Sequence, residues 1–176
     1  MPEDPLPVVQ GMVDYLYTGS YDDKRSAASD EIIESTSAAK YNARMFALAD
    51  KYQIDDLQTL SVRKYSNAIG ERCDLNTFFE SVPDVYLTTP DTARALRDAA
   101  LSFARCHLGT SLQIPDIQMA FDKVSMDVPD FARELLNSFL KAPVRGSCST
   151  CGPHQPMDIL QCRCKTCGKG GGRIED

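Results

Sequence analysis

The residues with the clearest chemical potential are cysteines near the C-terminus. Five of the seven cysteines fall between residues 148 and 167. They form two Cys-x-x-Cys-Gly units, Cys148-Ser-Thr-Cys151-Gly152 and Cys164-Lys-Thr-Cys167-Gly168. Two residues between the thiols let both sulfurs reach one ion, and the glycine that follows can adopt a positive φ. We therefore predict a structural Zn²⁺ site with four ligands: Cys148, Cys151, Cys164 and Cys167.

Two substitutions in this ligand set stay open. Cys162 could replace Cys164 in a less regular site, and His154 is the other substitute ligand. A disordered tail with free thiols and an oxidised cluster are the competing interpretations. Four thiolates leave no open coordination position, so a catalytic metal is disfavoured. The tail is too small to bury a core, and metal binding would supply its folding free energy, on the order of 10 kcal/mol.

The charge differs sharply between the two parts of the chain. Residues 1–140 carry 13 basic and 22 acidic side chains, whereas residues 141–176 carry 6 and 3. Phosphate contacts dominate nucleic-acid affinity, so the main part would be repelled and nucleic acid is disfavoured as a partner. No apolar run approaches membrane-spanning length, and the start lacks the pattern of a signal peptide. We expect a reducing intracellular location, cytoplasm or nucleus, and no membrane association.

Helical periodicity dominates the first 140 residues. Residues 8–18 predict a helix that ends at Gly19, and residues 21–34 predict a mobile acidic loop. Further helices are expected over 39–52, 54–69, 74–87, 90–108, 114–126 and 128–140. Ser37 is the predicted N-cap of the second helix, Pro83 should kink or split the fourth, and Gly109 should end the fifth. No segment alternates with period two over strand length, so the fold class is mainly α, with a hinge over 141–147.

Two of these segments carry a family resemblance. The first contains Tyr15-Leu16-Tyr17-Thr18-Gly19, and the second runs from Ala43 to Leu57 as ARMFALADKYQIDDL. In this order, with an acidic spacer, they resemble the second, helical half of a BTB/POZ domain of the fungal type. The resemblance covers roughly residues 7–67 and continues more weakly to about residue 139. It implies a partial BTB/POZ domain over 1–70, a helical extension over 71–140, and the hinge with a zinc-ribbon-like tail over 141–176.

The resemblance implies a function without chemistry. BTB/POZ domains join proteins together, by self-association or by capture of a partner, and members often recruit cullin-type ubiquitin ligases. A full domain begins with a dimerising helix and strands that have no counterpart here, so we expect a fragment whose first helix lacks its usual cover. The residues predicted to bind a partner are Val9, Met12, Val13, Leu16 and Tyr17.

Two alternatives to the adaptor interpretation remain. The tail could bind nucleic acid through four basic residues, Arg163, Lys165, Lys169 and Arg173, although a tetrathiolate zinc site at about −2 offsets their charge. The chain could also be an inactive truncated fragment. An enzyme is not expected, because Cys106 and His107 are adjacent on a helix and diverge, and no other catalytic constellation is visible.

Overall fold

The computed structural model describes residues 4–23, 37–70, 74–90, 93–142, 145–158, 163–170 and 173–174. Within these ranges the chain forms seven helices followed by four short strands. The helices are α1 (Leu6–Thr18), α2 (Ala38–Lys51), α3 (Asp55–Gly70), α4 (Leu75–Leu87), α5 (Arg94–Ser111), α6 (Pro115–Asp127) and α7 (Pro129–Lys141). The strands are β1 (Arg145–Cys148), β2 (Gly152–Asp158), β3 (Arg163–Cys164) and β4 (Arg173–Ile174).

Local sequence signals set several helix ends. Gly19 has φ 73° and donates its N–H to the carbonyl of Tyr15, as expected for a left-handed helix stop. The Ser37 hydroxyl accepts the N–H of Lys40 at 3.3 Å, which confirms the predicted N-cap of α2. Proline lies in the first turn of α1, α6 and α7, where its missing N–H costs no intrahelical bond.

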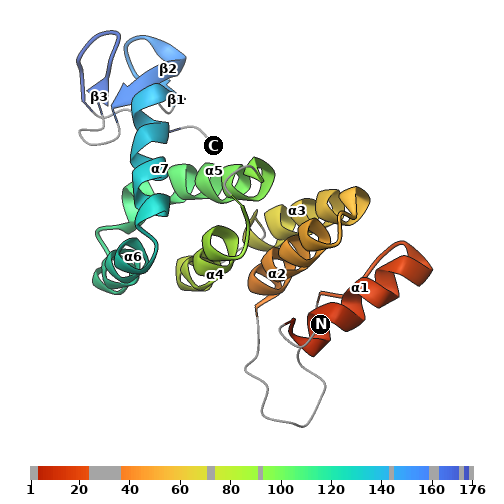
Figure 1. Ribbon diagram of the computed structural model, residues 1–176. Coiled ribbons are helices and arrows are strands. Elements are labelled where there is room, and N and C mark those ends of the chain that lie inside the picture. The colour runs from red at the N-terminus through yellow and green to blue at the C-terminus, as the bar shows by residue number, and fades with distance from the viewer. Residues whose placement is uncertain are drawn as a thin grey trace.

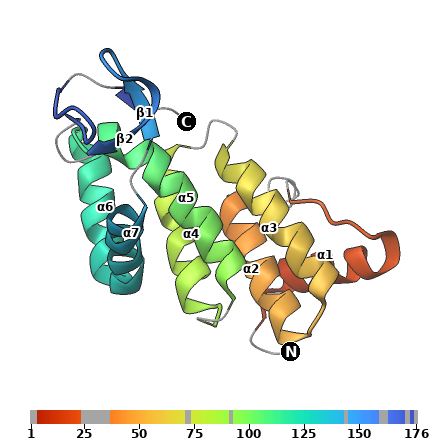
Figure 2. The same cartoon turned by 90° about the horizontal axis from the view of Figure 1, so that it is seen from above.

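The helices form an array of neighbouring pairs (Figures 1 and 2). A short turn at residues 52–54 reverses the chain, so that α2 and α3 pack against each other. Then α4 packs against α2, and α5 packs against α3. The pair α6 and α7 follows, and α1 lies at the opposite end of the array against α2.

One apolar core joins the helices from α2 to α7. Phe78 lies at its centre, fully buried, with its ring centroid 4.7 Å from that of Phe103 and 6.2 Å from that of Phe131. The cluster draws residues from both sides of position 70, from Ala39 on α2 to Leu135 on α7. A second cluster joins α1 to α2 and α3. The body therefore owes its cohesion to apolar packing between helices.

Two predicted helix interruptions are wrong. Pro83 does not split α4, which runs without a break from Leu75 to Leu87. Apolar residues before and after Pro83, including Val82 and Val85, are fully buried in the core, and their packing offsets the lost backbone hydrogen bond. Gly109 does not end α5, which continues to Ser111.

Tyr21 corrects the prediction of a mobile loop at its first residue. Its ring is 4% exposed, and its hydroxyl donates to the Oδ1 of Asn42 at 2.7 Å. The Lys64 ammonium lies 4.5 Å from the ring centroid and donates to the Tyr21 carbonyl. Residues 21–23 are therefore fastened to α2 and α3, while residues 24–36 of the predicted loop lie outside the described residues.

The tail follows α7 and forms a small antiparallel sheet. The strand order is β3-β2-β1-β4. Arg105 on α5 donates to the carbonyls of Ser138 and Ala142, so the end of α7 is held just before the tail begins. Figure 1 shows the sheet beyond that end of α7. Among the described helices, none combines the length and the apolar content that crossing a membrane requires.

Candidate metal centre

Tight turns place the two pairs of thiols. The first pair, Cys148 and Cys151, flanks the turn between β1 and β2, and the second pair, Cys164 and Cys167, flanks the turn after β3. The glycines that follow, Gly152 and Gly168, have φ angles of 85° and 69°. Only glycine adopts this conformation without a steric cost, as the two motifs predicted. Each turn is thereby closed into a compact loop with both sulfurs on one side.

The four thiols converge on one point. The sulfurs of Cys148, Cys151, Cys164 and Cys167 all lie within 4.8 Å of one another. The Cys148 and Cys167 sulfurs are 3.6 Å apart. A tetrahedral Zn²⁺ with Zn–S bonds of about 2.3 Å holds its sulfurs about 3.8 Å apart, whereas a disulfide bond is about 2.0 Å long. The arrangement therefore fits four ligands around one ion and does not fit two disulfides.

Backbone amides favour the thiolate form of two of these cysteines. The N–H groups of Thr150 and Cys151 point at the Cys148 sulfur and lower its pKa to about 6. Hydrogen bonds from the second turn, led by the Cys167 N–H, lower the pKa of Cys164. The pKa of Cys151 is instead raised to about 12, chiefly by its hydrogen bond with Cys167. Thiolates packed this closely repel one another, so a cation among them would stabilise the group.

Very little else stabilises the tail. Its buried cluster contains Met157, at 2% exposed, together with Cys148 and Cys164. Cys151 and Cys167 pack partly buried against it. A single methionine is far too small a core for an independent unit, so the sheet depends on whatever binds its thiols.

The two substitute ligands fare differently. His154 lies on β2, exposed, and does not belong to the four-thiol group. Its backbone is held in the left-handed region at φ 58°, and its carbonyl accepts a hydrogen bond from Arg145 at 2.9 Å. Cys162 lies outside the described residues, as do the side chains of Arg163 and Arg173 from the nucleic-acid alternative. Lys165 and Lys169 are exposed beside the second turn.

The predicted partner-binding helix is apolar on both of its faces. Its inner face packs on α2, where a Cβ added to Gly11 would lie 2.2 Å from the Tyr41 hydroxyl oxygen and 2.7 Å from the Met45 methyl carbon. Val8 and Met12 are buried in this contact, at 2% and 5% exposed. This corrects the expectation that the stripe from Val8 to Leu16 is uncovered, and it removes Met12 from any exposed surface.

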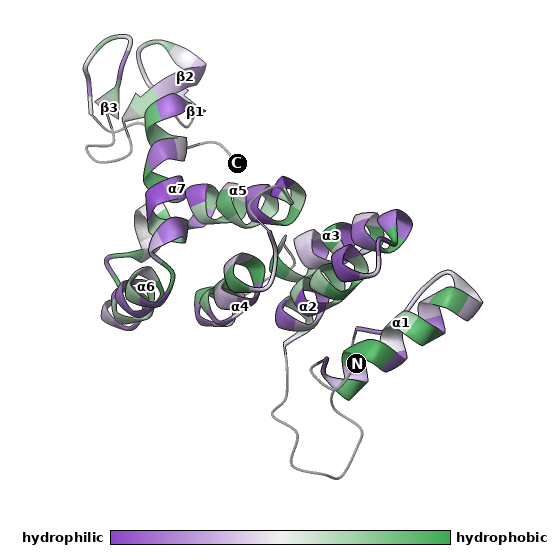
Figure 3. Ribbon diagram, viewed as in Figure 1, coloured by the Kyte–Doolittle hydropathy of each residue, from purple (hydrophilic) through white to green (hydrophobic). Residues whose placement is uncertain are grey.

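The outer face of α1 stays open. Val13, Leu16 and Tyr17 are 41%, 60% and 88% exposed, and Val9 is half-buried. Leu6, 78% exposed, shares this face because it stands seven residues before Val13 and eleven before Tyr17. The apolar colouring along α1 is visible in Figure 3. We define the outer face as Leu6, Val9, Val13, Leu16 and Tyr17.

No protein-family model, curated protein or solved structure matches this chain. The resemblance to BTB/POZ domains therefore rests on the two sequence motifs alone and stays a prediction. The helical body and the cluster of four thiols rest on the structure itself.

Two residues important to α1 were missed by the sequence reasoning. Leu6 belongs to the outer face, and the i, i+7, i+11 spacing with Val13 and Tyr17 could have revealed it. Gly11 allows the close approach to α2, and its place in the middle of an otherwise helical pattern was the available signal.

Proposed function

We propose that this chain is a protein-interaction module of the BTB/POZ adaptor type, with a tail stabilised by structural zinc. The observation that carries the adaptor role is the open outer face of α1. A helix that is apolar on both faces is typical of a protein interior, where each face has a neighbour. Here the inner face has α2 and the outer face has solvent, so another polypeptide is the natural cover.

The composition of this face favours a second copy of the same chain as that polypeptide. Asp14 is the sole charged residue between Leu6 and Thr18, and the outer face contains none. An uncharged apolar stripe is complementary to itself, as a two-fold symmetric contact requires. The rest of residues 1–140 is strongly acidic, so two copies would repel elsewhere and meet most favourably along α1.

The zinc part of the proposal rests on the ligand chemistry. Four cysteine sulfurs in a tetrahedral arrangement suit zinc among the common cellular metals, and they leave no position for a substrate. The metal would fold the tail and perform no reaction. Its removal should therefore change structure and leave self-association through α1 intact.

The test of the adaptor role is the solution mass of the full chain, measured by analytical ultracentrifugation over a hundredfold range of concentration. We expect a monomer–dimer equilibrium that the pair Leu16→Ser and Tyr17→Ser weakens at least tenfold. Leu136→Ser with Leu140→Ser, on the exposed side of α7, is the matched control and should change nothing. A monomer at every concentration would reject self-association. The resemblance then nominates a cullin-type ligase scaffold as the second partner to test against the same variants.

A further inference from the structure

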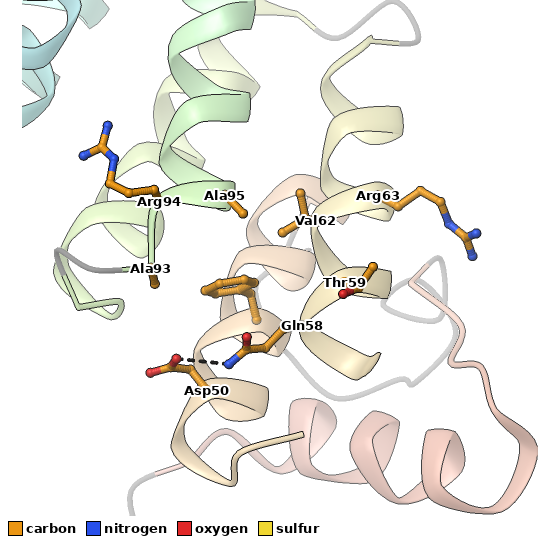
Figure 4. A pocket seen from close by; sticks show the side chains of 9 residues that line it. Asp50, Gln58, Thr59, Val62, Arg63, Ala93, Arg94 and Ala95 are labelled. Atoms are coloured by element: carbon orange, nitrogen blue, oxygen red, sulfur yellow. Dashed lines mark hydrogen bonds between the residues drawn. The ribbon is translucent and has the colours of Figure 1, made fainter. Parts of the chain in front are cut away.

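A groove opens on the side of the body away from the outer face of α1. It has a volume of about 640 Å³ and lies where α2, α3 and the first turn of α5 meet. Figure 4 shows its side chains, with the hydrogen-bonded pair Asp50 and Gln58 at one end. The volume is within the usual range for sites that bind small ligands or short peptide segments.

The floor of the groove is apolar and already formed. Phe46 is 3% exposed and belongs to the main core, and Val62 and Ala93 pack against that core. Ala95 is exposed at the wall, on the first turn of α5. Because two alanines line this wall, no large side chain fills the space. An apolar side chain of a partner could enter without any rearrangement of the helices.

The charges around the groove are distributed unequally. Arg94 is occupied by ion pairs with Asp98 at 2.8 Å and Glu134 at 2.9 Å. Arg63 is exposed, and within the described ranges no carboxylate pairs with it. Asp50 has one oxygen held by the Gln58 amide at 3.0 Å. Figure 4 shows Asp50 and Arg63 on different sides of the apolar floor. The guanidinium of Arg63 is thus the group left to recognise an anionic side chain.

We propose that this groove binds a short segment of another protein in which an acidic side chain lies close to an apolar one. The apolar side chain would lie on the floor formed by Phe46, Val62 and Ala93. The carboxylate would pair with Arg63, while Asp50 accepts a main-chain N–H of the segment. This site is separate from the outer face of α1, so either can fail without the other.

Two neutral-ended peptides serve as probes, acetylated and amidated Gly-Leu-Gly-Glu-Gly and its reverse, Gly-Glu-Gly-Leu-Gly. Each is titrated into the ¹⁵N-labelled, zinc-loaded full chain and compared with a version that has Lys in place of Glu. We expect shifts in the amides of Val62 and Ala95, with at least tenfold tighter binding of one acidic peptide than of its Lys counterpart. Arg63→Glu should reverse that preference.

Blocking the groove provides the steric test. Ala95→Trp should weaken the acidic peptide at least tenfold, whereas Ser102→Trp should not. Ser102 is exposed on the same face of α5, seven residues further along and outside the groove. The α1 pair Leu16→Ser and Tyr17→Ser should leave peptide binding unchanged. Equal affinity for the acidic and Lys peptides, binding that survives Ala95→Trp, or no shift at millimolar peptide would each overturn the proposal.

Discussion

The helical body and the tail are held together by different physical means. The body buries a continuous apolar cluster from Ala39 to Leu135, with aromatic rings at its centre. The tail buries one methionine, Met157, beside its cysteines. A chain segment as short as the tail cannot offset its conformational entropy with so little apolar area, whereas the body can. The comparison shows that cysteine spacing replaces hydrophobic periodicity as the source of structure within a single chain.

Polar groups in the body reinforce packing that is already present. Glu134 on α7 accepts hydrogen bonds from Arg94 on α5 and Tyr86 on α4. Arg97, 3% exposed, donates to the carbonyls of Tyr86 and Thr89 and stacks on the Tyr86 ring. These contacts tie three helices together around buried apolar residues. In the tail, by contrast, polar sulfur atoms are themselves the centre.

Removal of the zinc ligands should give the largest effect. Cys148→Ser with Cys167→Ser takes one thiol from each turn, so the binding free energy that folds the tail, on the order of 10 kcal/mol, would be lost. We expect loss of bound zinc by elemental analysis and collapse of the amide dispersion of residues 145–170 by NMR. The helical signals of residues 6–141 should persist.

Cys106→Ser is the matched control, because Cys106 is exposed on α5 and far in sequence from the four thiols. It should keep the zinc content of the parent protein. Helix loss after zinc removal would show that the body also depends on the metal, and the contrast between the two regions would be wrong.

A cavity in the body tests the other side of the comparison. Phe78→Ala removes a fully buried ring that contacts three other aromatic side chains, Phe79, Phe103 and Phe131. We expect the free energy of unfolding of the body to fall by about 3–5 kcal/mol, measured by urea denaturation followed by circular dichroism. Zinc content should not change. Leu136→Ala, at a position 58% exposed, should cost less than about 0.5 kcal/mol.

Local signals were sufficient to predict the helices and the thiol cluster. Periodic apolar residues, Ser37 and Gly19 mark helix interiors and ends, and each acts within a few residues of itself. The Cys-x-x-Cys-Gly spacing also acts locally, because one tight turn positions both sulfurs. The sequence could not show how the two turns would meet, although the chemistry of four thiolates required it.

The features that the sequence missed depend on contacts between distant segments. Pro83 stays inside a helix because core packing on both sides of it outweighs a lost hydrogen bond. Tyr21 is buried by Asn42 and Lys64, which no local pattern reveals. The groove beside Phe46 exists because α5 begins with small residues near α3, a juxtaposition set by the tertiary fold.

A smaller effect is expected where α1 meets the body. Gly11→Ala would place a methyl group against Tyr41, whose hydroxyl is held by the Pro7 carbonyl at 3.1 Å, and against Met45. Alanine favours a helix by up to about 1 kcal/mol, and the clash opposes it by about 1–3 kcal/mol. We expect a net loss of about 1–2 kcal/mol and faster hydrogen exchange in α1.

Gly70→Ala is the control for this change, because open space surrounds its Cβ position. It should leave exchange in α1 unaltered. Unchanged exchange in Gly11→Ala itself would mean that α1 is not anchored by close contact with α2, and the apolar body would then end at α2.

The two regions should also differ in the direction of their pH sensitivity, and this gives the smallest expected effect. Protons compete with zinc for the thiolates, so the tail should loosen in acid. In the body, burial and the neighbouring Glu134 raise the pKa of Tyr86, and burial raises that of Tyr21. An unfolded tyrosine ionises near pH 10 while these two keep their protons in the folded state. Stability is therefore fully present below pH 10 and declines as the pH rises further.

Each of these tyrosines should contribute up to about 1.4 kcal/mol per pH unit to that decline. Tyr86→Phe removes one titrating hydroxyl, so a plot of unfolding free energy against pH from 9 to 11.5 should become shallower by that amount. Adding Tyr21→Phe should flatten it by a similar further step, although each change costs about 1 kcal/mol at neutral pH through a lost hydrogen bond. An unchanged slope in the double variant would show that both hydroxyls ionise equally well in the folded body. Alkaline sensitivity would then have to originate elsewhere than in the helical core.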